Sequence, residues 1–158
     1  MIKVNTCHIQ ELPLELKGTE SSEVLGGLPC GAVPQGDIRY DFRASMAGQD
    51  LLVRGSAEVT LCAECARCLE DIRRTIRVGD VCIMVENCPD REVDITPQVC
   101  EELLLAMPVR FLCAEDCRGL CPGCGANLNR EKCTCARKKK KEKTSSGPSP
   151  WDVLDQLQ

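Results

Sequence analysis

Six cysteines lie within residues 113–135, a segment that contains few apolar side chains. A segment this short and polar cannot fold by burying apolar surface alone. We therefore expect a metal ion or disulfides to stabilise it. The turn from Cys121 to Gly125 is a C-x-x-C motif in which glycine supplies positive φ and backbone N–H groups turn toward the sulfurs. Two thiolates at this spacing reach one tetrahedral zinc ion at about 2.3 Å. The sequence therefore predicts a C-terminal, cysteine-rich zinc module.

The sulfurs of this segment outnumber the four positions of a tetrahedral zinc site. In order of preference the ligands are Cys121 and Cys124, then Cys133 and Cys135, then Cys117, with Cys113 last. Which four bind stays open at this point. We expect one zinc ion per chain, with its binding coupled to the folding of 113–135. Reduced thiols without a ligand, or a disulfide knot, are the alternatives.

A second group, Cys62, Cys65 and Cys68, lies where a predicted strand turns. A redox pair requires C-x-x-C at the start of a helix in a βαβ setting, whereas this group follows a hairpin pattern. The spacing also fits a second zinc site, or a contribution of Cys65 and Cys68 to the C-terminal site. Thiols without a ligand are the favoured interpretation. The scattered cysteines Cys7, Cys30, Cys82, Cys88 and Cys100 are expected to pack as small apolar residues.

The run DCRGLCPGCGANLN over 116–129, followed by Cys133-x-Cys135, resembles the signature of the YceD-like family, the large ribosomal RNA subunit accumulation proteins. Further matching pieces occur in the order that this family shows. They are Gly55 leading a strand into CARCLE at 65–70, the segment from Asp94 to Pro108, and the tail SPWDVLDQL at 149–157. The resemblance covers roughly residues 38–157.

This resemblance implies a non-catalytic factor that supports accumulation of large-subunit ribosomal RNA during assembly of the large ribosomal subunit. The implied partners are that RNA or the precursor subunit, with a basic ribosomal protein as a further candidate. Two alternatives come from other classes: a thiol redox or metal-binding protein that uses its C-x-x-C groups, and a generic protein-binding adaptor. Reactivity of Cys65 or Cys68 at neutral pH would favour the redox alternative.

Length and charge limit the organisation of the chain. Its 158 residues suffice for one ordinary domain with an appendage. The first residues do not form a signal-peptide pattern, and no apolar run approaches the roughly 18 residues of a membrane span, so we expect a cytoplasmic protein. Residues 1–136 carry 14 basic and 21 acidic side chains, whereas 137–143 carry six basic and one acidic. That basic run is either a solvated linker or an RNA contact.

The hydropathy pattern predicts an α+β fold with a mostly antiparallel, partly barrel-like sheet and one packed helix. Apolar residues alternate over 38–62, as in an antiparallel hairpin that turns near Gly48. Two further strands are predicted over 72–78 and 81–85, separated by Gly79-Asp80, while residues 1–36 are expected to give one strand and a loop. A helix is predicted after Thr96 as N-cap, ending at Pro108.

The predicted domains are an α+β core over 1–112, the zinc module over 113–135, a disordered basic linker over 136–149 and a short helix over 150–158. The tail contains Trp151, Leu154 and Leu157 on one predicted face. A helix of this length is marginal alone, so we expect it to dock on its own domain or on a partner.

Enzyme chemistry is not expected. His8 is the only histidine, and a zinc site with four thiolates has no position for an activated water. We therefore predict neither catalysis nor a small-molecule substrate. The arginines near the second cysteine group, Arg67, Arg73, Arg74 and Arg77, are candidates for phosphate contacts. Aromatic residues are too few for base stacking, so any RNA contact should recognise backbone and shape.

Overall fold

The computed structural model describes residues 1–9, 12–133 and 135. The chain forms two compact units, Met1–Cys117 and Arg118–Gln158, and all the described helices and strands lie in the first. Cys113 and Cys117 therefore belong to the same unit as the sheet, although the sequence suggested that they belong with the C-terminal cysteines. The linker and helix predicted over 136–149 and 150–158 lie outside the described residues.

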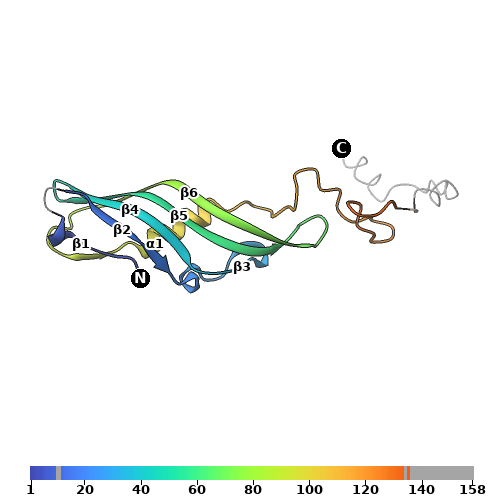
Figure 1. Ribbon diagram of the computed structural model, residues 1–158, viewed down its shortest axis with the longest axis horizontal. Helices are drawn as coiled ribbons and strands as arrows, with labels where there is room; N and C mark the ends of the chain where they lie inside the picture. Colours follow the sequence, from blue (N-terminus) through green and yellow to red (C-terminus); the bar gives the residue numbers. More distant parts are fainter. Residues whose placement is uncertain (10–11, 134, 136–158) are drawn as a thin grey trace, which may run out of the picture. The chain divides into compact units, whose positions relative to one another are not determined.

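The first unit is built on an antiparallel sheet (Figure 1). Its strands are β2 (Leu14–Glu20), β3 (Val33–Pro34), β4 (Ile38–Ala47), β5 (Asp50–Glu64) and β6 (Asp71–Val85). Strand β4 pairs with β2 and β5, and β5 pairs also with β3 and β6. No described residue of β2 pairs with β6, so the sheet is open. The mostly antiparallel α+β fold is confirmed, but the sheet is not closed into a barrel.

The hairpin predicted over 38–62 is confirmed by the pairing of β4 with β5, from Arg39 opposite Glu58 to Ala47 opposite Asp50. Gly48, in the connecting turn, has φ +71°. Alternate residues of both strands are buried, including Phe42, Val53 and Val59. The period-2 pattern is reliable here because one face of the sheet is solvated and the other is buried.

The two strands predicted over 72–78 and 81–85 are one continuous strand, β6. Ala57 pairs with Val78 and Gly55 pairs with Val81, so Gly79 and Asp80 together oppose Ser56. This arrangement is a β-bulge, which places an extra residue in one strand without ending the pairing. A Gly-Asp pair is as typical of a bulge as of a turn, so the prediction of a turn between two strands was wrong.

The N-terminal region contains more structure than the one strand that was predicted. Strand β1 (Lys3–Asn5) pairs with β7 (Glu92–Asp94) in a separate two-stranded sheet. Three 3-10 helices connect the elements that precede β4: η1 (Thr6–His8), η2 (Ser22–Leu25) and η3 (Pro29–Gly31). The hydroxyl of Thr6 donates to the carbonyl oxygens of Cys88 and Arg91, which fastens the N-terminus beside β7.

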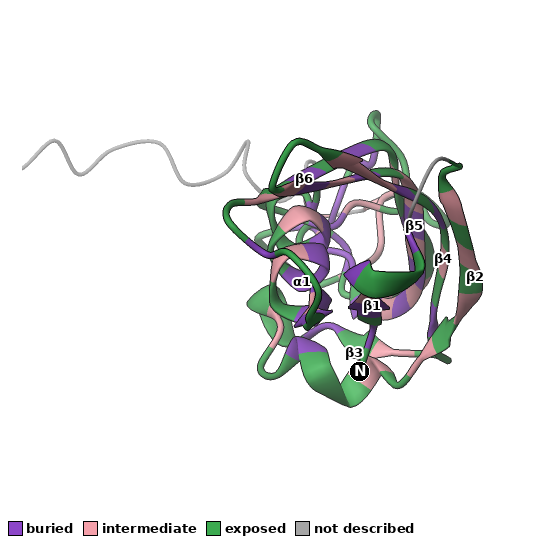
Figure 2. Ribbon diagram, turned by 90° about the vertical axis from the view of Figure 1, so that its left-hand side faces the viewer, coloured by how far each residue is buried: buried purple, intermediate pink, exposed green. Residues whose placement is uncertain are grey.

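Helix α1 (Thr96–Leu105), the one α-helix among the described residues, lies against the sheet, which curves around it (Figure 2). Val99 and Leu103 are fully buried in the same core as Val53 and Val59. The prediction of Thr96 as N-cap was wrong, because Thr96 is the first helical residue. The N-cap position is taken by Ile95, which has no capping side chain. One residue earlier, the carboxylate of Asp94 accepts hydrogen bonds from the Thr96 N–H at 2.9 Å and from its hydroxyl at 2.5 Å.

The five scattered cysteines divide into two kinds. Cys88 and Cys100 are buried in the core, as predicted for small apolar side chains. The same prediction was wrong for Cys7, Cys30 and Cys82, which are exposed. Cys82 lies on β6 opposite Arg54. Both side chains are on the solvent-facing side of the sheet, opposite the side that faces the core. Burial of an isolated cysteine therefore follows from its place in the fold rather than from its residue type.

Candidate metal centres

Eight cysteines form two groups of four. The first group, named site A, consists of Cys65, Cys68, Cys113 and Cys117. The second, named site B, consists of Cys121, Cys124, Cys133 and Cys135. Within each group all the Sγ atoms lie within 4.8 Å of one another. Each set can hold one metal ion.

The turn between β5 and β6 supplies half of site A. Cys65 follows directly on β5, and its N–H donates to the carbonyl of Glu70, while the N–H of Leu69 donates back to the Cys65 carbonyl. Leu69 has φ +58°, a left-handed conformation that closes the turn. Cys65 and Cys68 consequently project on the same side of the turn and are both buried.

The segment that follows α1 supplies the other half. The N–H of Ala66 donates to the carbonyl of Phe111 at 2.8 Å, which holds this segment beside the turn. Phe111 itself is 1% exposed and belongs to the main core. Cys113 and Cys117 therefore reach site A because the core anchors the residues immediately before them.

Arg67 fastens the two halves of site A together. Its guanidinium donates to the carbonyl oxygens of Glu115 at 3.1 Å and Cys117 at 2.9 Å. The sequence grouped Arg67 with the arginines that were candidates for phosphate contacts. The structure shows that Arg67 positions site A, since these bonds engage its guanidinium with the loop that carries Cys117.

The protonation of site A is uneven. Burial raises the pKa of the Cys65 thiol, but the backbone N–H groups of Arg67, Cys68 and Cys113 outweigh it and lower that pKa to about 6. Hydrogen bonding with Cys117, together with burial, raises the pKa of Cys113 to about 12. The backbone N–H groups thus favour the thiolate form of Cys65, whereas the neighbouring sulfurs favour the thiol form of Cys113.

Site B lies within a compact knuckle of the second unit. The N–H of Gly125 donates to the carbonyl of Cys121, and the N–H of Cys121 donates to the carbonyl of Ala126, each at 2.8 Å. Gly125 has φ +74°, as the C-x-x-C turn required. The N–H of Gly123 points to Cys121 Sγ at 3.4 Å, and a Cβ at Gly123 would lie 3.3 Å from Cys135 Sγ. The two glycines allow the backbone to pack tightly around the sulfurs.

The thiols of site B differ in the same way as those of site A. Cys133, together with the N–H groups of Gly123 and Cys124, lowers the pKa of Cys121 to about 6. Its neighbours Cys124 and Cys133 raise the pKa of Cys135 to about 12. One thiolate per site is thus stabilised before any metal binds, which is an arrangement suited to capturing a cation.

The sulfur separations of site A match a tetrahedral thiolate site, and those of site B are shorter. With Zn–S bonds of about 2.3 Å, a regular tetrahedron has S···S edges of about 3.8 Å. In site A the Sγ atoms of Cys65 and Cys117 are 3.8 Å apart, and those of Cys68 and Cys113 are 3.7 Å apart. In site B Cys133 Sγ lies 3.1 Å from Cys121 Sγ and 3.6 Å from Cys124 Sγ. No cysteine forms a disulfide, so neither group is a disulfide cluster.

The predicted ligands fall into both sites. Cys121, Cys124, Cys133 and Cys135 come together in site B, whereas Cys117 lies in site A. Of the second sequence group, Cys65 and Cys68 join site A, but Cys62 lies on β5 opposite Arg73. Cys113, the least favoured candidate in the sequence, belongs to site A. The cysteines of 113–135 therefore belong to two sets of four, and the division between the sets falls between Cys117 and Cys121. This division explains why the segment contains more sulfurs than one ion can bind.

Comparison with known proteins gives the chain its relatives. An uncharacterized protein of Mycobacterium tuberculosis is 29% identical over 133 residues, which is 74% of this chain and 64% of that protein. A chloroplastic protein of Arabidopsis thaliana named large ribosomal RNA subunit accumulation protein YCED homolog 1 is 38% identical over 50 residues, 32% of this chain and 16% of its own length. The chain thus spans less than two thirds of the length of these relatives. No solved structure is significantly similar to it.

Among the described residues, no helix combines the length and the apolar character needed to cross a membrane. Residues 53–158, which include both cysteine sites, match the family described as large ribosomal RNA subunit accumulation protein YceD. This match covers more than half of the chain and confirms the resemblance drawn from the cysteine motifs. The chain therefore belongs to the YceD family of large ribosomal RNA subunit accumulation proteins.

Proposed function

We propose that this chain is a zinc-carrying, non-catalytic cytoplasmic factor that supports the accumulation of large-subunit ribosomal RNA during assembly of the large ribosomal subunit. The observation that carries the proposal is the family match over 53–158, because it includes all eight cysteines of sites A and B. The names of the Arabidopsis thaliana and Zea mays relatives support the same role.

Zinc is the metal that best suits both sites. Each offers four thiolate donors, and soft sulfur ligands in a tetrahedral set favour Zn²⁺ over the oxygen-seeking Mg²⁺ and Ca²⁺. The Sγ separations of 3.7 and 3.8 Å in site A support this choice. Cys65, Cys68, Cys113 and Cys117 would hold one ion, and Cys121, Cys124, Cys133 and Cys135 a second.

A structural role for the metal supports the non-catalytic part of the proposal. Four protein ligands fill a tetrahedral zinc ion and leave no position for a substrate or an activated water. Thiol redox chemistry has less support, because Cys65 is fully buried and its C-x-x-C motif lies in a turn between strands rather than at a helix N-terminus. The partner that we propose is the precursor large subunit, bound through its RNA or through a basic ribosomal protein.

The test is depletion of the protein, followed by gradient fractionation of ribosomal particles. We expect a fall in mature large-subunit RNA and an accumulation of precursor large particles, with the protein itself sedimenting with the precursors. Wild-type protein supplied from a plasmid should restore the profile, and a C68S/C124S double variant, disrupted in both sites, should not. Unchanged RNA levels and profiles after depletion would refute the proposed role.

A further inference from the structure

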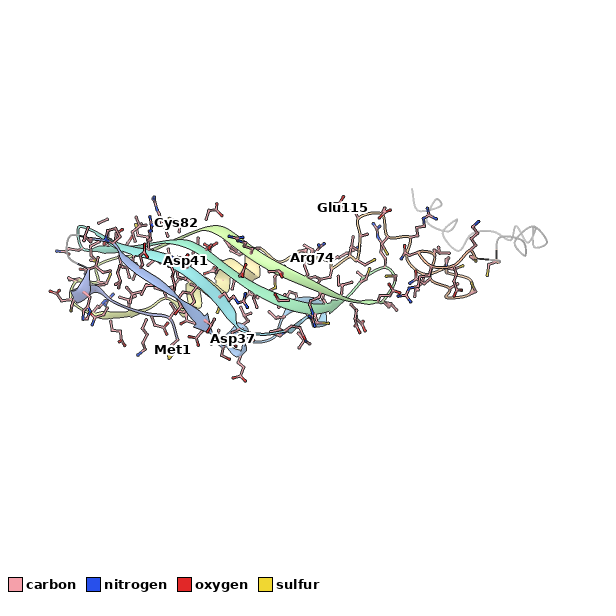
Figure 3. The ribbon with its side chains drawn as sticks, in the orientation of Figure 1. Met1, Asp37, Asp41, Arg74, Cys82 and Glu115 are labelled. Atoms are coloured by element: carbon pink, nitrogen blue, oxygen red, sulfur yellow. The ribbon has the colours of Figure 1, made fainter. Side chains whose placement is uncertain are left out.

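A shallow hollow of about 530 Å³ lies over the β-bulge, on the side of the sheet away from α1. Its rim carries four cations, Lys17, Arg43, Arg54 and Arg77, and a single carboxylate, Asp41. They come from four neighbouring strands, β2, β4, β5 and β6, so the sheet itself fixes their spacing. Asp41 and Cys82, labelled in Figure 3, mark β4 and β6 on either side of β5.

The cations of this rim are incompletely neutralised. Lys17 pairs with Asp41 at 3.3 Å, and Arg43 pairs with Glu15 at 3.4 Å. Arg54 and Arg77 form no ion pair with any residue that the structure describes. The rim thus retains positive charge in a chain whose formal net charge is −4.

The strand register places two of these cations directly against each other. Arg43 and Arg54 are cross-strand partners on β4 and β5. Like charges in this position destabilise a sheet, in contrast to the opposite charges that usually pair there. An anion between the two guanidinium groups would relieve the repulsion and gain bidentate hydrogen bonds from both.

The floor of the hollow consists of small residues, Gly55, Ser56 and Gly79. Gly55 has φ +154°, and a Cβ at this position would lie 2.0 Å from the carbonyl oxygen of Asp41. No side chain is therefore possible at Gly55 without moving β4. The floor therefore consists of backbone atoms and one hydroxyl. It can accommodate a ligand whose contacting groups are small and polar.

We propose that this hollow binds the phosphodiester backbone of RNA, and the proposal rests on the proposed function in ribosomal RNA accumulation. Arginine forks suit phosphate oxygens, and cations from four strands can follow successive phosphates. No aromatic or large apolar side chain lines the hollow, so it lacks both a base-stacking platform and the anchors typical of a protein interface. Recognition here depends on charge and backbone shape, not on base sequence.

The decisive variant is R54Q/R77Q, which removes the two cations without ion pairs and leaves Lys17 and Arg43 with their carboxylates. The matched control is R91Q/R110Q, which removes two exposed arginines of the same unit that do not line the hollow. A charge-preserving variant, R54K/R77K, separates the loss of charge from the loss of side-chain packing. Circular dichroism and melting curves establish that all three proteins fold.

Binding is measured by fluorescence anisotropy with the full chain and two labelled probes, a single-stranded RNA and an RNA duplex of about 20 nucleotides, across roughly 50 to 300 mM KCl. R54Q/R77Q should lower the affinity about tenfold at low salt and reduce the slope of log affinity against log salt by about 1.4 to 1.8. R91Q/R110Q should change the affinity less than about twofold, and R54K/R77K should keep the wild-type slope.

Two results would overturn the hollow as an RNA site. One is that R54Q/R77Q binds RNA with the wild-type affinity and the wild-type salt dependence. An acidic protein surface would then be the ligand to test next. The other is the absence of salt-sensitive RNA binding by the wild-type chain. Neither result decides the proposed function, which is judged by ribosomal RNA levels after depletion. Conversely, normal RNA levels after depletion, combined with the expected loss in R54Q/R77Q, would refute the function and keep the site.

Discussion

The Sγ atoms of Cys65 and Cys117 lie 3.8 Å apart although 52 positions separate them in the sequence. They meet because the core anchors Phe111, whose carbonyl accepts a hydrogen bond from Ala66 in the turn after β5. Site A is therefore a product of the tertiary fold, whereas the ligands of site B all lie between Cys121 and Cys135. This difference governs how the two sites should respond to mutation.

Metal content should be two zinc ions per chain in protein purified under reducing conditions. C68S and C124S should each reduce the content to about one, because each removes one of four ligands from a different site. C82S is the control, since Cys82 is exposed and outside both sites, and it should retain two ions. Elemental analysis with native mass spectrometry measures the ratio, and a wild-type value of zero or one would contradict the two-site assignment.

Zinc binding should release protons and weaken in acid. Cys113 in site A and Cys135 in site B each have a pKa raised to about 12, so each must lose a proton to coordinate the metal at neutral pH. The lowered pKa values of Cys65 and Cys121, about 6, add a further proton competition as the pH falls below that value. Affinity should therefore rise with pH from about 5 to 8. Calorimetry in buffers of different ionisation enthalpy counts the protons, and a pH-independent affinity would be inconsistent with four thiol ligands.

Replacement of Arg67 by Ala should loosen site A without removing a ligand. The two bonds from its guanidinium to the loop of Glu115 and Cys117 would be lost, at a cost of about 1 kcal/mol for so exposed a side chain. Zinc at site A should then be removed faster by a chelator, while site B releases its ion at the wild-type rate. R67K is the informative control, because a lysine retains the charge but replaces the planar guanidinium, whose Nη1 makes both bonds, with a compact ammonium. Equal release from both sites in R67A would argue against a positioning role.

Gly55→Ala should destabilise the first unit, whereas Gly79→Ala should be tolerated. A Cβ at Gly55 would collide with the backbone of β4, and its φ of +154° is unfavourable for alanine, so we expect a loss of roughly 1–3 kcal/mol. Gly79 lies in the same bulge, but a methyl group there would have nothing within 4 Å and would meet no unfavourable φ. Urea unfolding measures both variants. Similar stability of the two would show that the bulge does not depend on close approach of β4 and β5.

Asp94 should make the stability of the first unit depend on pH in acid. Its hydrogen bonds from the hydroxyl and N–H of Thr96 lower the pKa of its carboxyl below the usual value. A lowered pKa means that the contribution is complete above the unfolded value of about 3.9 and is lost as the pH falls through the folded value. D94A should cost about 1 kcal/mol at pH 7, because two hydrogen bonds from Thr96 are lost, and it should make the free energy of unfolding less dependent on pH in acid. D94N keeps a hydrogen-bond acceptor without the charge. It should therefore also make the free energy of unfolding less dependent on pH in acid, with a smaller loss of stability at pH 7 than D94A.

Local patterns predicted much of the fold. The alternation of apolar residues over 38–62 identified the hairpin because each residue's environment there depends mainly on its own strand face. The same reasoning found α1 but misplaced its cap by one residue, since the backbone places Ile95, whose side chain cannot cap a helix, at the N-cap position. The bulge at Gly79 and Asp80 was missed because its residue types equally suit a turn.

The assignment of ligands could not be completed from the sequence. Cys65-x-x-Cys68 and Cys113-x-x-x-Cys117 have spacings suited to a metal, and together they supply one tetrahedral set. Nothing local indicates that these two pairs meet, because their encounter requires the packing of α1 and Phe111 on the sheet. Site B was predictable as a set because its C-x-x-C and C-x-C pairs lie close together in the chain.

A metal in site A would act as a cross-link across a long loop. Pinning Cys68 to Cys113 closes a loop of about 45 residues, which removes about 4 kcal/mol of chain entropy from the unfolded state, whereas the loop of site B is worth about 3 kcal/mol. That loop contains β6, β7 and α1, which contribute Ile76, Val93 and Leu103 to the main core. Metal binding would therefore raise the free energy of unfolding of the whole first unit, so a shortage of the ion would increase the fraction of chains in which that unit is unfolded.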